Sequence, residues 1–200
     1  KVRTLCHPDG TRKVTGGTNA AGSTTALAVS SGMTFKDGTK EATVTGQMGH
    51  IFAKKLLDAG YDVLLIRDGD DVQLDNVART VLANNKADAH IALHWDSTEK
   101  DKGAFFMSVP DSLKKMEPVA SHWESHEKLG ESLIAGLKGK GVKIFSSGSM
   151  DMDLTQTSYS TIPSVDIELG DKISDHSEKQ LDLLGDALVD GVNKYYGFTS

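Results

Sequence analysis

The chain has 200 residues, 38% of them hydrophobic and 25% charged, which suits a folded domain and excludes a disordered chain. Its 28 acidic and 22 basic residues give a formal net charge of −6, and without a basic block a nucleic-acid partner is excluded. No apolar run approaches the roughly 20 residues that a membrane span needs. A single cysteine, Cys6, excludes an internal disulfide framework.

The N-terminal quarter is the least regular part of the sequence. Residues 1–7 read as a short strand. The stretch 10–40 is rich in Gly, Ser and Thr and shows little helical periodicity. Within it, the apolar runs 26–29 and 33–35 would pair as a hairpin across residues 30–32. Because a loop of this length is uncommon in a compact domain, we expect it to be functional or mobile.

From Thr39 onward, predicted helices and strands alternate. Apolar spacing predicts helices over 41–59 and 74–82, from about 121 to 137, and from the capping residue Ser177 onward, with Thr39 as the cap of the first. Short apolar runs predict strands at 62–67, 89–95, 104–109, 142–145 and 164–169. This alternation favours one α/β domain over residues 1–200. We expect a three-layer sandwich, with a largely parallel twisted sheet, helices on both faces, and an insertion at about 10–40.

Polar residues stand where three of the predicted strands end. His7, His94 and Glu168 hold these positions, and Glu41 opens the helix after the long loop. In open α/β sheets functional groups gather at the carboxyl ends of strands, and catalytic zinc usually takes three His or carboxylate ligands. The residue types therefore suit a zinc site. The wide separation along the chain equally allows His7 and His94 to be ordinary residues at strand ends.

Several segments in order resemble one known family. They are Lys40-Glu41 at a helix start, the run 57–63 (LDAGYDV), Arg67, the strand residues 91–94 (IALH), and 162–174 (IPSVDIELGDKIS). Together they resemble the zinc-dependent N-acetylmuramoyl-L-alanine amidases of the amidase type 3 group. That family has a zinc-exopeptidase-like α/β sandwich as its catalytic domain.

The resemblance implies a function and a site. His7, Glu41 and His94 would be the ligands of one Zn²⁺ ion, and Glu168 the catalytic glutamate. The substrate would be peptidoglycan or a muropeptide, cleaved at the amide between N-acetylmuramic acid and L-alanine by a cell-wall amidase or autolysin. Such an enzyme acts outside the cytoplasmic membrane, secreted or in the wall or periplasm, although no leader is visible. The oligomeric state is not predicted.

The chain also departs from the family pattern. His7 lies in the run Cys6-His7-Pro8-Asp9-Gly10, whereas the family has a turn like Asp-Pro-Gly-His-Gly, and the interval from His7 to Glu41 is longer than usual. Trp95 and Asp171 also replace family residues. We expect the insertion to form one wall or lid of the substrate groove. Two alternatives stay open: a non-catalytic peptidoglycan-binding module on the same fold, and a zinc carboxypeptidase acting on peptides.

Overall fold

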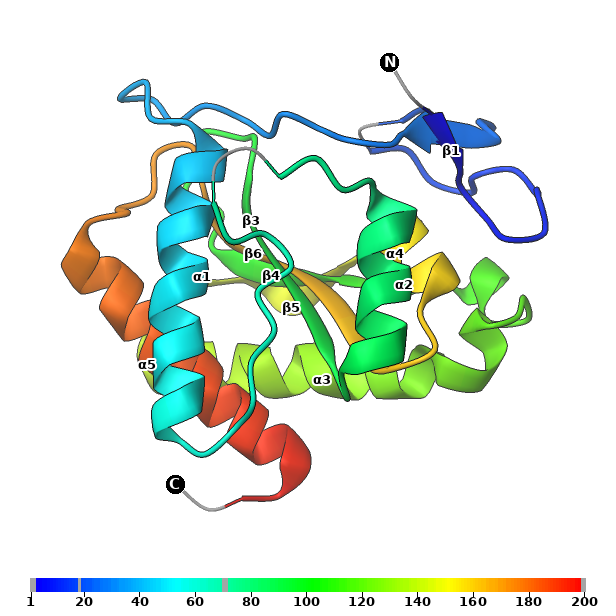
Figure 1. The fold of residues 1–200 in the computed structure, drawn as a ribbon. Coiled ribbons are helices and arrows are strands. Elements are labelled where there is room, and N and C mark those ends of the chain that lie inside the picture. The colour runs from blue at the N-terminus through cyan, green and yellow to red at the C-terminus, as the bar shows by residue number, and fades with distance from the viewer. Residues whose placement is uncertain (1–2, 18, 70–71, 199–200) are drawn as a thin grey trace.

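The computed structural model describes residues 3–17, 19–69 and 72–198, and Figure 1 shows their arrangement. Helices surround a central sheet, and a long N-terminal segment runs across one end of it. In chain order the elements are β1 (Arg3–Leu5), β2 (Thr25–Leu27), α1 (Glu41–Asp58), α2 (Asn76–Lys86), β3 (His90–Asp96), β4 (Ala104–Ser108), a 3₁₀ turn η1 (Asp111–Leu113), α3 (Val119–Gly139), β5 (Ile144–Asp151), α4 (Thr155–Tyr159), β6 (Ser164–Asp171) and α5 (Glu178–Tyr196).

The central sheet has the strand order β3-β6-β4-β5. β3 pairs with β6 and β4 with β5 in parallel, while β4 and β6 run antiparallel. The predicted α/β class with a mostly parallel sheet is therefore confirmed. The last strand in sequence, β6, lies between β3 and β4, so residues far apart along the chain become neighbours at its edges.

Strand alternation decides which side chains of β6 reach the core. Val165, Ile167 and Leu169 are buried in the main apolar cluster. Successive strand residues point to opposite faces, so Asp166 and Glu168 lie together on the other face. In the parallel register Glu168 stands opposite His94, and Asp166 opposite Ala92. The sheet therefore places polar side chains of two strands on one face.

The core is closed by three long helices, α1, α3 and α5, packed with the strands. At the α3–α5 contact the backbones approach so closely that a Cβ at Gly136 would lie 2.1 Å from the carbonyl oxygen of Ala187. Glycine is therefore required there. The fully buried large side chains of the cluster include Met48, Trp95, Leu129, Leu133, Leu137, Ile167, Leu181, Leu184 and Leu188.

The predicted regular elements after residue 73 are confirmed, including the Ser177 cap, whose hydroxyl accepts a hydrogen bond from the Gln180 N–H at 3.4 Å. The strand predicted at 62–67 is wrong. That segment is irregular and lies along α1, where the Arg67 guanidinium donates to the Ala42 carbonyl and the Thr45 hydroxyl. Leu64, in the middle of the segment, is exposed, and no strand pairs with the segment among the described residues.

The N-terminal predictions also need correction. β1 joins β2 in a separate two-stranded antiparallel sheet, so it is no part of the central one. The hairpin between 26–29 and 33–35 does not form, because β2 has already paired with β1. The residue that caps α1 is Lys40, without a side-chain hydrogen bond, and Thr39 lies one position too early. Within the described ranges, no helix has the length and apolar character to cross a bilayer.

Candidate active site

Residues from three elements meet at His94. Glu41 is the first residue of α1, His94 belongs to β3, and Asp166 and Glu168 come from β6. The Nδ1 atom of His94 lies 3.0 Å from Oε1 of Glu41, and its Nε2 atom lies 3.6 Å from Oδ2 of Asp166. One imidazole, 44% exposed, is thus held between two carboxylates, with Glu168 beside it in the sheet register.

Glu41 is fixed by backbone donors from two directions. Its Oε2 accepts the Met33 N–H at 2.7 Å, and its Oε1 accepts the Trp95 N–H at 3.2 Å. Gly32 lies so close that a Cβ there would be 2.7 Å from Oε2. The end of the Gly/Ser/Thr-rich segment therefore rests directly on this carboxylate. A side chain held this firmly, and only 7% exposed, is preorganised for binding.

The charges of the centre are coupled. Burial would lower the pKa of His94, but the charge of Asp166 and the hydrogen bond to Glu41 outweigh it and raise the pKa to about 10. Burial, followed by the charge of Asp166, raises the pKa of Glu168 to about 8. Burial likewise raises the pKa of Asp166. The pKa of Glu41 is lowered, because the His94 contacts overcome its burial. The centre therefore carries excess negative charge, which favours a bound proton or cation.

Two carboxylate oxygens of this centre are buried without a hydrogen-bond partner among the described residues. They are Oδ1 of Asp166 and Oε2 of Glu168. Buried polar atoms are normally satisfied, and each exception costs about 1–3 kcal/mol. Such unsatisfied atoms, gathered beside an accessible imidazole, mark the face of β6 as a site for a cation or a polar substrate.

The structure does not bring His7 to this centre. Its side chain is fully buried, its Nδ1 lies 2.8 Å from the Thr11 hydroxyl, and its Nε2 lies 2.8 and 2.9 Å from the two carboxylate oxygens of Asp153. Within the described residues the structure therefore does not bring His7, Glu41 and His94 together as one cluster. The physical reason is that β1 pairs with β2 outside the central sheet, so its end does not share an edge with β3.

The fit of a zinc ion can be judged from the donors that remain. Oε1 of Glu41 and Nδ1 of His94 are 3.0 Å apart, a separation that two ligands of one ion can have. In the part of the chain that the structure describes, no group of three or more His, Cys, Asp or Glu residues is arranged to hold a metal ion. The residues present therefore supply two zinc donors and not the three that were expected.

Sequence reasoning missed two acidic residues. Asp166 precedes Glu168 by two positions on a predicted strand, and this alternation already puts both on one face. That signal was available. Asp153 lies in no predicted element and far from His7 along the chain, so nothing local indicated their pairing.

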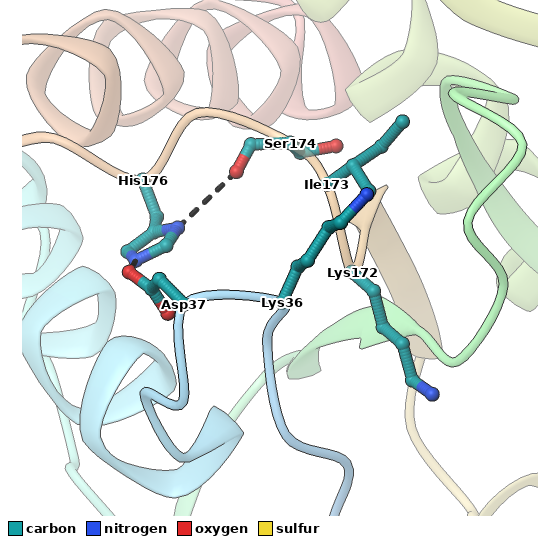
Figure 2. Close-up of a pocket in the computed structure, with 6 residues that line it drawn as sticks. All are labelled: Lys36, Asp37, Lys172, Ile173, Ser174 and His176. Carbon is teal, nitrogen blue, oxygen red and sulfur yellow. Dashed lines mark hydrogen bonds and ion pairs between the residues drawn. The ribbon is translucent and has the colours of Figure 1, made fainter.

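The structure has a cavity of about 340 Å³ (Figure 2). It is formed by the loop before α1 and the loop after β6, and its lining residues are Lys36, Asp37, Lys172, Ile173, Ser174 and His176. In Figure 2 the Lys36 side chain reaches toward Ile173, while Lys172 extends away from the others. The His176 ring lies between Oδ2 of Asp37, at 3.1 Å, and the Ser174 carbonyl, at 3.2 Å.

Aromatic contacts run from this cavity into the core. The buried Phe35 ring packs against His176 of the cavity at 4.2 Å between ring centroids, and against Trp95 at 5.9 Å. The backbone of Trp95 in turn donates to Glu41.

Comparisons with known proteins agree with this architecture. The sequence profile of the N-acetylmuramoyl-L-alanine amidases matches residues 16–186. A comparison with curated proteins gives no match. The fold is similar to the amidase Ami1 from Mycobacterium smegmatis, with a TM-score of 0.75, 19% identity, and coverage of 88% of this chain and 85% of that one.

Two further solved structures share the fold. AmiC2 of Nostoc punctiforme is similar with a TM-score of 0.67 and 21% identity, over 84% of this chain and 90% of that chain. An N-acetylmuramoyl-L-alanine amidase from Clostridium difficile 630 is similar with a TM-score of 0.67 and 20% identity, over 85% and 91% of the two chains. At these identities the likeness concerns the fold alone.

Proposed function

Because the chain belongs to the N-acetylmuramoyl-L-alanine amidase family, we propose that it hydrolyses the amide between N-acetylmuramic acid and L-alanine in peptidoglycan. The observation that carries this proposal is the centre itself, where Glu41, His94 and Glu168 meet on one face of the sheet. A substrate in the bacterial wall places the activity outside the cytoplasmic membrane, secreted or in the wall or periplasm.

Glu168 is the acid–base group of this proposal. Its carboxylate takes a proton from the attacking water and passes it to the leaving amine of the peptide. General acid–base catalysis is most efficient when the pKa of the group lies near the working pH. Burial and the neighbouring Asp166 raise the pKa of Glu168 to about 8, which supports this role near neutrality.

The proposal includes one zinc ion with Glu41 and His94 as protein ligands. The donor chemistry and their 3.0 Å separation support these two residues. When bound, zinc would polarise the scissile carbonyl and lower the pKa of a water molecule. His7 has no part in this proposal, since Thr11 and Asp153 occupy both of its ring nitrogens.

The surroundings of the centre support a peptide-bearing substrate. Lys36 and Lys172 line the cavity between the loop before α1 and the loop after β6, and their ammonium groups would attract the carboxylates of a stem peptide. We further assign residues 28–35 of the insertion to the groove wall, because Met33 contacts the Glu41 carboxylate. The more N-terminal part of the insertion packs with β1 and Asp153, away from the centre.

A defined muropeptide tests the reaction. The purified chain, with and without added zinc, is incubated with N-acetylmuramyl-peptide, and the products are identified by mass spectrometry. We expect release of a peptide with a free L-alanine amino terminus. Loss of a C-terminal amino acid would indicate a carboxypeptidase instead. No cleavage with zinc present would contradict both.

Matched histidine variants test the zinc ligand. His94→Ala is expected to lose bound zinc and turnover together. His50→Ala is the control, because His50 is an exposed helix residue paired with Asp68, far from the carboxylate cluster along α1. It should keep both. A His94→Ala chain with unchanged metal content would remove His94 from the ligand set.

A second candidate function is a non-catalytic peptidoglycan-binding module on the same fold. The displacement of His7 from the centre favours it, because the structure describes only two of the three expected ligands there. The two candidates differ in their products. A binding module would sediment with purified peptidoglycan and release no peptide from it, even with zinc added.

A further inference from the structure

Asp171 is a buried carboxylate that the proposed reaction does not use. It is the last residue of β6, three residues after Glu168, so the two Cα atoms are at most roughly 11 Å apart. Asp171 is fully buried, and it is one of the residues by which the chain departs from the family pattern. A buried carboxylate costs free energy unless hydrogen bonds satisfy it, and an apolar residue would fill the position without that cost.

A register shift at the end of the sheet turns this carboxylate toward the site. His94 stands opposite Glu168, but the next paired residues are Asp96 and Asp171, so β6 has one extra residue between the two pairs. A shift of one residue moves the side chains that follow to the other face of a sheet. Asp171 therefore shares the face of His94 and Glu168, whereas plain alternation would direct it to the core face with Leu169.

The Asp171 carboxylate joins the two loops that follow the strands of the site. Its Oδ2 accepts the Lys102 N–H at 3.1 Å and the Thr98 hydroxyl at 3.5 Å, both from the loop after β3. Its Oδ1 accepts the Ile173 N–H at 3.1 Å, from the loop after β6. One side chain therefore fastens the two loops to each other.

Further hydrogen bonds continue this connection to the cavity of Figure 2. The Asp171 N–H donates to the Ser174 hydroxyl at 2.8 Å, and the Ser174 N–H donates to the Asp171 carbonyl at 3.0 Å. The Lys172 carbonyl accepts the Lys36 N–H at 3.0 Å, which attaches the loop before α1. Lys172, Ile173 and Ser174 line the cavity from one loop, and Lys36 lines it from the other. The placement of these lining residues therefore depends on Asp171.

We propose that Asp171 is a positioning residue of the substrate groove: it holds the loop after β6 in the shape that binds the stem peptide, and it takes no part in bond cleavage. The inference rests on the proposed function, because it takes the cavity to be the site of the stem peptide. A loop that is already ordered loses less entropy when a ligand binds. Releasing the loop should therefore weaken substrate binding and leave the chemical step nearly unchanged.

Steady-state kinetics on a defined muropeptide test the proposal in Asp171→Asn and Asp171→Ala. Asparagine keeps one acceptor oxygen, but its amide NH₂ cannot accept an N–H, so the contact to one of the two loops is lost. We expect KM to rise about tenfold in Asp171→Asn, with kcat within about threefold of the parent chain. The matched control is Asp175→Asn, since Asp175 is exposed in the same loop, accepts the Ser177 N–H and does not line the cavity. Its KM should not change.

Amide hydrogen exchange reports the loops directly. The amides of Lys102 and Ile173 should lose protection in Asp171→Ala and keep it in Asp175→Asn. A purely structural role predicts a lower free energy of unfolding with an unchanged KM in the folded fraction, and that result would overturn the proposal. A fall in kcat with an unchanged KM would also overturn it, because the effect would then lie on the chemical step.

Binding of a labelled stem peptide, measured by fluorescence anisotropy, separates this inference from the proposed function. If the parent chain binds the peptide but cleaves no muropeptide, the proposed function fails. A dissociation constant about tenfold larger in Asp171→Asn would still support the role of Asp171. Equal dissociation constants in the parent chain and the variant, or no binding by the parent chain, would reject that role.

Discussion

Two histidine clusters of this protein have opposite designs. His7 is fully buried, and both its ring nitrogens have partners in Thr11 and Asp153. His94 is partly exposed and lies among three carboxylates, two of which keep a buried oxygen without a hydrogen-bond partner in the described part of the chain. In the His7 cluster the ring nitrogens have hydrogen-bond partners, whereas the His94 cluster contains buried carboxylate oxygens that lack them among the described residues.

The difference teaches which cluster serves stability and which serves chemistry. Asp153 also accepts the Val14 N–H at 2.7 Å and so ties the N-terminal segment to the chain after β5. Such closed networks stabilise a fold. Titratable groups with strongly shifted pKa values and unused hydrogen-bond acceptors are typical of functional sites. The family-like motifs in the sequence did not show which of the two histidines belongs to the active centre. The hydrogen bonds of each histidine do.

The largest expected effect is on turnover and tests the cluster around His94. Glu168→Gln should lower the turnover number on muropeptide about 10²- to 10⁴-fold, because the amide cannot take the proton of the attacking water. Zinc content, measured by metal analysis, should not change. A variant that releases peptide at the parent rate would remove Glu168 from the reaction.

The next effect is on stability and tests the cluster around His7. His7→Ala leaves the buried Asp153 carboxylate without its imidazole partner and should lower the free energy of unfolding by about 3 kcal/mol, measured by urea denaturation. The folded fraction should keep its zinc affinity and turnover. If this variant instead lost zinc while remaining folded, His7 would belong to the metal centre after all.

A smaller effect tests how closely the insertion controls the centre. Gly32 and Gly38 both have a positive φ, at 73° and 92°, so alanine strains the backbone at either position. Only at Gly32 would the added Cβ press on the Glu41 carboxylate; at Gly38 it meets nothing within 4 Å. We expect Gly32→Ala to weaken zinc binding about tenfold, by roughly 1.4 kcal/mol. Gly38→Ala should leave it unchanged, and equal zinc affinity in both variants would contradict the contact.

The last prediction concerns the pH dependence of the zinc-free chain. Glu168 and His94 have folded-state pKa values of about 8 and about 10, both above their usual values of 4.5 and 6.5. The folded chain thus binds more protons than the unfolded chain, and stability should fall as the pH rises from 6 to 9. Urea midpoints at these pH values check the sign. Glu168→Gln should show a shallower fall, and a rise in the parent chain would contradict the coupling.

Local patterns predicted most of the regular structure. The helical period of Val44, Met48 and Phe52, and the Ser177 cap of α5, depend on neighbours within a few residues, and the structure has both elements where they were expected. The segment 62–67 shows the limit of such patterns. Its apolar run predicts a strand, but a strand forms only where another strand offers its edge. Among the described residues none pairs with this segment, and Arg67 at its end bonds to α1 instead.

The sequence by itself determined the α/β class, the family, and the residue types of the site, because each of these follows from short-range patterns and ordered motifs. The sequence also indicated Glu41, His94 and Glu168 as candidate site residues. Only the tertiary structure decided that β1 pairs with β2, that His7 therefore belongs with Asp153, and that Asp166 stands against His94. These contacts join distant parts of the chain and depend on which strands pair in the complete fold. No local sequence pattern encodes that pairing.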